Sequence, residues 1–129
     1  MIGVGVHMRV LIADNSTALS ERLADHLGDL AGVEIVGQAK DAATARDLSA
    51  RLKPDLTILD TLDSGGDWIG LLQYLKRSRP GSKVIMLTNF VEAENREMCE
   101  RNGADYFFDK SIEFDKAVAV IRGMRRGAG

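Results

Sequence analysis

Polar side chains that could do chemistry stand directly after several short apolar runs of the chain. In chain order they are Asp14 and Asn15, then Asp60, then Thr88 and Asn89, and finally Lys110. If the runs are strands of one parallel sheet, their carboxyl ends share one edge, where ligands bind in such sheets. These side chains would then lie together and form one polar site.

The residue types in this set suit phosphoryl chemistry. Two carboxylates that lie close together repel each other unless a cation joins them, and hard oxygen ligands favour Mg²⁺ over zinc. A hydroxyl from Thr88 and an ammonium from Lys110 would hold an oxyanion beside the metal. Asp60 is then a candidate nucleophile toward a phosphoryl group, with Mg²⁺ and Lys110 neutralising charge during the transfer.

Each of these residues alone has an ordinary structural explanation. An aspartate after a strand is often a helix cap, a lone threonine is often a turn residue, and a lone lysine is usually solvated. Asp60 differs, because it ends an apolar strand, where burial without a partner would be costly. The joint occurrence of the set after the apolar runs is what favours a functional site.

The apolar runs alternate with segments of helical period along the whole chain. The expected strands cover 10–13, 35–36, 56–59, 84–87 and 106–108, and the expected helices lie around 19–30, 45–52, 69–75, 92–101 and 114–121. Five strands that alternate with five helices indicate an α/β fold with a mainly parallel sheet. Uninterrupted apolar strands support parallel pairing, because such strands are buried on both faces.

Length and composition indicate one globular domain. A chain of 129 residues can bury a core without disulfides or metals to hold it, and its 45% apolar and 28% charged residues are ordinary for a soluble protein. We expect a single domain over 1–129, with a core at about 8–122 and frayed ends.

Charge and cysteine usage narrow the function classes. The formal charge is −2 and the pI is about 5.7, which does not favour direct binding to nucleic acid or to a membrane surface. We interpret the basic clusters 76–79 and 122–126 as solvated helix ends. No apolar run is long enough to span a membrane, and no secretory signal is evident. The single cysteine, Cys99, cannot form an internal disulfide, so we expect a cytoplasmic protein.

Four segments of the chain carry a pattern in a fixed order. They are 10–16 (VLIADNS), 54–60 (PDLTILD), 84–88 (VIMLT) and 103–110 (GADYFFDK). Together they resemble the receiver domain of bacterial two-component response regulators, in the CheY-like superfamily, and the resemblance covers about 8–122. No single segment is decisive, but four segments in order on the right elements make the match specific.

The resemblance implies a flavodoxin-like, doubly wound sheet of five parallel strands in the order 2-1-3-4-5 with five helices. It implies that Asp60 accepts a phosphoryl group from the phosphohistidine of a histidine kinase or a histidine phosphotransfer protein. Asp14, Asn15 and Asp60 would hold Mg²⁺, together with the backbone carbonyl of Leu62. No separate substrate is expected, only phosphorylation of the domain itself and its later dephosphorylation.

The same resemblance assigns roles to residues later in the chain. Thr88 and Lys110 would contact the phosphoryl oxygens, and Phe107 matches the aromatic residue that moves inward with the threonine. This conformational switch would signal to a partner or an output domain. In the family, the face corresponding to 92–122 often serves output and dimerisation, which leaves a homodimer through it open.

Several positions depart from the family pattern. Asn15 stands where a second acid is usual, which should weaken Mg²⁺ binding, and the loop after the acceptor has Ser64 and Trp68 in place of a proline and a glycine. Asn89 stands where a small residue is usual, so we expect narrower access or a changed phosphoryl lifetime. Ser111 replaces a proline that follows a cis bond. Because a cis bond before a non-proline residue costs about 2.5–4 kcal/mol, we expect a trans bond or a rearranged loop here.

Three other functions were weighed against this one. A degenerate receiver-like module that binds partners without phosphate is favoured by Asn15 and the altered loops. An FMN-binding flavodoxin would need a Ser/Thr/Gly-rich loop after the first strand, whereas 14–19 begins with an acid and has no glycine. A phosphatase of the haloacid dehalogenase type has two aspartates two residues apart, whereas Asp60 and Asp63 are three apart.

Overall fold

A computed structural model gives the fold and describes residues 8–14, 17–27, 32–60 and 67–127. The strands are β1 (Met8–Ala13), β2 (Val33–Ala39), β3 (Leu56–Leu59), β4 (Lys83–Thr88) and β5 (Tyr106–Asp109). The helices are α1 (Thr17–Leu27), α2 (Ala42–Leu52), α3 (Trp68–Ser78), α4 (Ala93–Arg101) and α5 (Phe114–Gly127). The predicted ends 1–7 and 128–129 lie outside the described residues, whereas Gly127 still belongs to α5.

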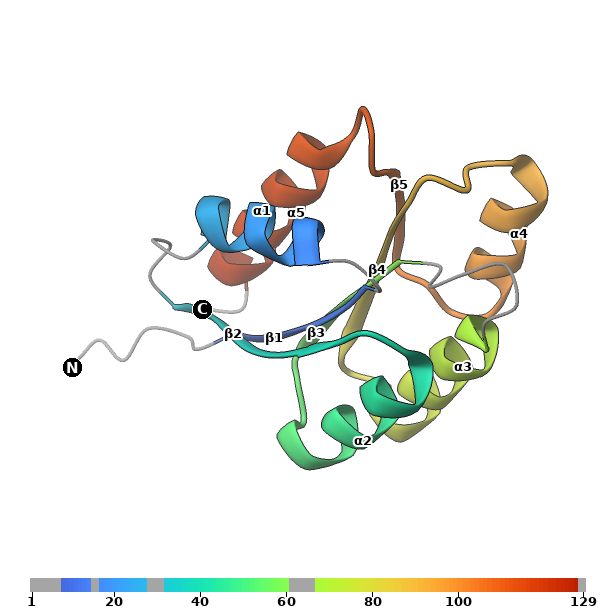
Figure 1. The fold of residues 1–129 in the computed structure, drawn as a ribbon, viewed down its shortest axis with the longest axis horizontal. Coiled ribbons are helices and arrows are strands. Elements are labelled where there is room, and N and C mark those ends of the chain that lie inside the picture. The colour runs from blue at the N-terminus through green and yellow to red at the C-terminus, as the bar shows by residue number, and fades with distance from the viewer. Residues whose placement is uncertain (1–7, 15–16, 28–31, 61–66, 128–129) are drawn as a thin grey trace.

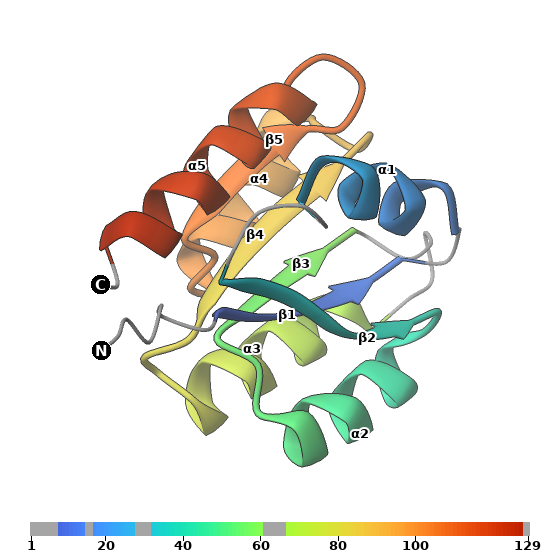
Figure 2. The ribbon, with the colours of Figure 1, turned by 90° about the vertical axis from the view of Figure 1, so that its left-hand side faces the viewer.

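The strands form one parallel sheet in the order β2-β1-β3-β4-β5, which confirms the predicted fold class and strand order. Helices α1 and α5 cover one face of the sheet, and α2, α3 and α4 cover the other (Figures 1 and 2). Among the described helices, none is long and apolar enough to cross a membrane.

The core consists of two apolar layers, one on each face of the sheet. Successive side chains of a strand point to opposite faces, so Ile58 packs in the layer under α1 and α5, while Leu59 packs in the layer under α2, α3 and α4. All four residues of β3 are buried, as predicted for a central parallel strand. Burial in the second layer raises the pKa of the Cys99 thiol to about 12, so this thiol stays protonated.

Strand β2 is longer than its sequence suggests. The sequence pattern predicts only 35–36, because β2 lies at the sheet edge and most of its residues are half-buried or exposed. Its pairing with β1 also shifts by one residue, from Val10↔Ile35 to Leu11↔Gly37. This irregularity interrupts the alternation of apolar and polar residues by which a strand is predicted.

Helix α2 begins and ends with clear local signals. Asp41 is its N-cap and accepts a hydrogen bond from Thr44 N at 2.7 Å through Oδ1. The helix ends at Leu52, and Lys53 takes the left-handed conformation with φ of 50°. Pro54 follows, so the predicted stop at this proline is confirmed.

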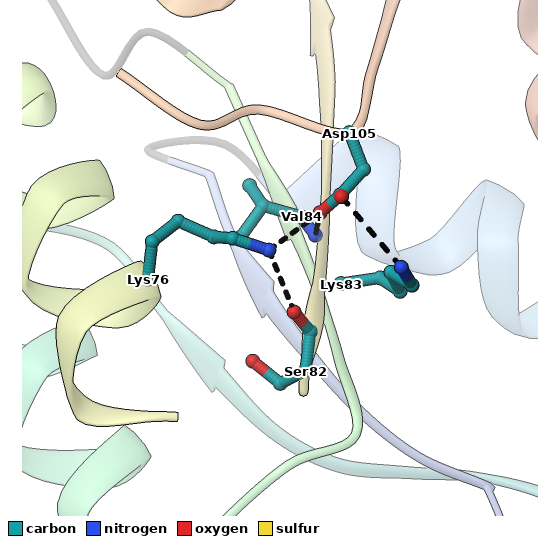
Figure 3. Close-up of polar contacts among 5 residues, drawn as sticks. All are labelled: Lys76, Ser82, Lys83, Val84 and Asp105. Atoms are coloured by element: carbon teal, nitrogen blue, oxygen red, sulfur yellow. Dashed lines mark hydrogen bonds and ion pairs between the residues drawn. The ribbon is translucent and has the colours of Figure 1, made fainter. Parts of the chain in front are cut away.

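Lys76, in the last turn of α3, points toward the start of β4 rather than into solvent (Figure 3). Its Nζ donates to Asp105 Oδ2 and to Ser82 O, both at 2.9 Å. Asp105 Oδ2 also accepts from Val84 N at 2.8 Å, and Asp105 Oδ1 lies 3.8 Å from Lys83 Nζ. The interpretation of this basic cluster as a solvated helix end is therefore wrong for Lys76, because Asp105 gives it a half-buried partner that is distant in the sequence.

Candidate functional site

The carboxyl edge of the sheet brings four of the predicted side chains into one region. Asp14 follows β1, Asp60 follows β3, Thr88 ends β4 and Lys110 follows β5. Backbone hydrogen bonds continue the sheet past its strands, since Asp60 N donates to Ala13 O at 3.0 Å and Lys110 N donates to Thr88 O at 2.8 Å. The parallel topology therefore collects these residues, which lie far apart in the sequence.

Asp60 and Lys110 form the closest polar contact at this edge. Lys110 Nζ donates to Asp60 Oδ2 at 2.6 Å, and the side chains are 22% and 6% exposed, respectively. The other carboxylate oxygen, Asp60 Oδ1, is buried and has no hydrogen-bond partner among the described residues. A buried carboxylate oxygen without a hydrogen bond is unfavourable, and a hydrogen-bond donor or a cation beside it would stabilise it.

Asp14 supplies a second buried carboxylate beside Asp60. It is fully buried, and its backbone N donates to Ala39 O at 2.9 Å, which holds the end of β1 against β2. Asn15 and Leu62, the other predicted metal ligands, lie outside the described residues. Within the described ranges no group of three His, Cys, Asp or Glu side chains could hold a metal. The two buried carboxylates still fit Mg²⁺, which is held by few protein oxygens and keeps several waters.

Thr88 is fully buried at the end of β4, and its Oγ1 accepts a hydrogen bond from Phe90 N at 3.0 Å. The next residue, Asn89, is exposed, and its Oδ1 accepts a hydrogen bond from Ser111 Oγ at 2.9 Å. Ser111 N in turn donates to Asp109 Oδ1 at 2.8 Å. Two residues that depart from the family pattern therefore join the loops after β4 and β5. The bond between Lys110 and Ser111 is trans, as expected.

Phe107, the predicted switch residue, is 6% exposed and packs in the core layer under α4. The guanidinium carbon of Arg96, from α4, lies 4.6 Å from the centroid of its ring. Arg96 NH1 also donates to Phe107 O across a long 3.4 Å contact. We expected Arg96 to be exposed on the face 92–122, but it is half-buried against this ring. The contact could not be predicted, because neither charge nor helical period shows which ring an arginine covers.

Glu113 is a second residue that we expected to be exposed on this face and that the structure shows half-buried. Its Oε1 accepts a hydrogen bond from Asp109 N at 2.8 Å, and its Oε2 lies 3.1 Å from Lys116 Nζ. These bonds, the backbone one first, hold the pKa of Glu113 below its usual value. The position of this glutamate just before the predicted helix 114–121 is the sequence signal that could have indicated its hydrogen bonds at the start of that helix.

Comparisons with known proteins place this geometry in one family. The model of the response regulator receiver domain matches residues 10–122. The response regulator protein VraR of Staphylococcus saprophyticus is 25% identical over 115 residues, which cover 89% of this chain and 55% of that protein. A protein-glutamate methylesterase/protein-glutamine glutaminase of Xanthomonas oryzae is 38% identical over 85 residues, which cover 66% of this chain and 24% of that protein. The chain thus spans about half, or less, of the length of these curated relatives.

Solved structures agree with this assignment. The response regulator domain of Thermotoga maritima CheB superposes with a TM-score of 0.78 at 27% identity and covers 95% of this chain and 96% of that chain. The receiver domain of NarL from Mycobacterium tuberculosis has a TM-score of 0.81, covers 95% of this chain and 98% of that chain, and shows the fold alone at 22% identity. The chain therefore belongs to the response regulator receiver domain family of two-component systems.

Proposed function

We propose that this receiver domain accepts a phosphoryl group on Asp60 from a phosphohistidine on a histidine kinase or a phosphotransfer protein. The observation that carries the proposal is the buried Asp60 carboxylate, which pairs with Lys110 at 2.6 Å and leaves Oδ1 without a partner among the described residues. Mg²⁺ belongs to the proposal, because the family generally binds it at the phosphorylation site. The solved CheX–CheY complex of Borrelia burgdorferi, a structural neighbour, contains BeF₃ and Mg²⁺.

In the proposed reaction, a carboxylate oxygen of Asp60 attacks the phosphorus atom of the donor. A new P–O bond forms while the P–N bond breaks, and the imidazole of the donor leaves with that electron pair. Lys110 then binds a phosphoryl oxygen as well as Asp60, and it neutralises negative charge during the transfer. Mg²⁺, held by Asp14, Asp60 and the predicted ligands Asn15 and Leu62, would neutralise the remaining phosphoryl charge.

The signalling step uses the residues around Thr88. Its hydroxyl, which accepts from Phe90 N, would turn to a phosphoryl oxygen, and a hydroxyl can donate as well as accept. This turn removes an acceptor from the loop after β4 and changes the packing around Phe107. A partner or an output domain would then read the changed surface.

The test is the intact mass of the folded protein after incubation with a small-molecule phosphodonor, with and without Mg²⁺. We expect wild type to gain one phosphoryl group only when Mg²⁺ is present. Asp60→Ala should gain none, because the proposed nucleophile is missing. Asp47→Ala is the matched control, since Asp47 is an exposed aspartate on α2, and it should behave as wild type.

A folded wild-type sample that gains no phosphoryl group at saturating donor would overturn the proposal. The domain would then act as an interaction module that works without phosphate. Equal gain in Asp60→Ala would move the acceptor to another residue. Gain without Mg²⁺ would remove the metal from the mechanism while leaving Asp60 in place.

A further inference from the structure

A cavity of about 280 Å³ lies between the carboxyl-terminal ends of α2 and α3. These helices run side by side over one face of the sheet (Figures 1 and 2). The cavity is lined by Ser49, Ala50, Lys53, Tyr74, Ser78 and Arg79. Lys53 precedes β3 and Asp60 follows it, so the cavity and the proposed phosphorylation site lie at opposite ends of that strand.

The lining of this cavity is cationic and rich in hydroxyl groups. Among its six lining residues two are cations, three carry hydroxyls and none is acidic. Lys53 and Arg79 form no ion pair with any residue in the described part of the chain. Their charges are therefore not neutralised locally, which favours a negatively charged ligand.

Ser49 adds an observation that is independent of charge. This residue is 3% exposed, and it is one of the residues that line the cavity. Ser78, in the equivalent last turn of α3, donates its hydroxyl to Tyr74 O at 2.6 Å. The Ser49 hydroxyl lines the cavity and can donate a hydrogen bond to a ligand bound there.

Two helix carboxyl ends border the cavity, and their partial negative charges oppose an anion. The backbone oxygens there already accept hydrogen bonds, however. Lys53 N donates to Ser49 O, Arg79 N to Leu75 O, Ser78 Oγ to Tyr74 O, and Arg79 Nε to Pro54 O. The full positive charges of Lys53 and Arg79 therefore outweigh the partial negative charges of the two helix ends, whose carbonyl oxygens already accept hydrogen bonds.

We propose that this cavity binds a small ligand that carries a phosphoryl or carboxylate group. The ammonium of Lys53 and the guanidinium of Arg79 bind its oxygens, and the hydroxyl of Ser49 donates a hydrogen bond to it. The volume of about 280 Å³ suits a small anionic metabolite, because larger ligands usually occupy about 300–1,000 Å³. Lys76 does not line the cavity, and its ammonium is already bound to Ser82 O and Asp105 (Figure 3).

The test is a titration of the ¹⁵N-labelled protein with inorganic phosphate, followed by amide chemical shifts in Mg²⁺-free buffer at constant ionic strength. We expect saturable shifts at the amides of Ser49, Lys53 and Arg79. A parallel titration with acetate distinguishes a phosphoryl ligand from a carboxylate ligand. Saturation by one anion alone identifies the class, and saturation by both supports a general oxyanion site.

Lys53→Asn is the main variant, because asparagine tolerates the left-handed conformation of Lys53 while the charge is removed. It should raise the dissociation constant about tenfold, which is typical for the loss of one charged hydrogen bond. Arg77→Gln is the matched control, since Arg77 is an exposed cation on α3 that does not line the cavity, and its binding should equal that of wild type.

Shifts that grow linearly with anion concentration would overturn the proposal, and so would equal affinity in Lys53→Asn and Arg77→Gln. Either result means that the anions act on the surface charge in general. The outcome is separate from the fate of Asp60, because no phosphodonor or Mg²⁺ is present.

Discussion

Among the individual side chains, the contact between Lys110 and Asp60 has the clearest connection to the proposed function. One partner is almost fully buried, so the ammonium stabilises a carboxylate that water barely reaches. The same ammonium can neutralise a phosphoryl oxygen once Asp60 carries one. A single side chain therefore contributes to the stability of the resting site and to the proposed transfer.

Replacing Lys110 separates these two contributions. We expect Lys110→Gln to slow phosphoryl uptake from a small donor about 100-fold, because one preorganised charge is lost from the transfer. It should also lower the free energy of unfolding by about 1–3 kcal/mol, since Asp60 loses its partner. Phosphorylation time courses and urea denaturation measure the two effects. Lys116→Gln, which removes an exposed lysine, is the control, and an unchanged uptake rate in Lys110→Gln would limit Lys110 to a structural role.

Sequence alone predicted part of this site. Asp14, Asp60, Thr88 and Lys110 each follow or end an apolar strand, and parallel topology then requires them to share one edge. The hydrogen bond between Asn89 and Ser111 could not be predicted, because it joins two exposed residues 22 positions apart whose loops have no regular period. Sequence motifs indicate which groups meet at a strand end, but not how the loops above them bond.

At the scale of the elements, helix α2 has a titratable cap. Asp41 accepts backbone and side-chain hydrogen bonds from Thr44, which hold its pKa below the ordinary value of 3.8. A carboxyl with a lowered pKa in the folded state stabilises that state above the unfolded value. This contribution is lost as the pH falls through the folded pKa.

Two variants of Asp41 test this pH dependence. Asp41→Ala should be less stable than wild type at pH 7, and the difference should shrink as the pH falls below about 3.8. Asp41→Asn keeps a cap that does not titrate, so its advantage over Asp41→Ala should stay constant with pH. Urea midpoints between pH 3 and pH 7, in steps of about half a unit, measure both differences. A pH-independent gap between wild type and Asp41→Ala would contradict the proposed role of the carboxylate.

The elements themselves could be predicted to different degrees. The three inner strands, β1, β3 and β4, have apolar runs that their burial explains, and α2 ends before Pro54 as its sequence indicates. Strand β2 was predicted with only two of its seven residues, because an edge strand with an irregular register has no simple pattern. The partner of Lys76 was missed for another reason, since Asp105 is 29 residues away.

For the molecule as a whole, the proposed metal site predicts a link between Mg²⁺ and stability. A ligand that binds only the folded state stabilises it by about 2.7 kcal/mol at 100 times its dissociation constant. We expect Mg²⁺ to raise the thermal midpoint of wild type, and Asp14→Asn to lose most of this increase. Asp25→Asn, which changes an exposed aspartate on α1, should retain it. Thermal unfolding with increasing Mg²⁺ measures the effect, and equal stabilisation of both variants would place the metal elsewhere.

The fold and the family of the whole chain were predicted correctly, because alternating strands and helices allow few arrangements of one parallel sheet. The single domain over 1–129 and a homodimer through the face 92–122 remain predictions. Exposed apolar side chains on that face, Met98 and Tyr106 among them, are compatible with a partner but do not identify one.

The position of β1 inside the sheet has a consequence for the growing chain on the ribosome. β1 is made first, yet one of its two neighbours, β3, is made much later, and Arg9 N finds its partner Asp55 Oδ2 only 46 residues downstream. Until Leu56–Leu59 emerges, β1 has an open edge, and α3, α4 and α5 are not yet made to cover the apolar faces of the sheet. This state favours wrong pairing between chains. We therefore expect this domain to fold late in its own synthesis and in one step, rather than from its first half onward.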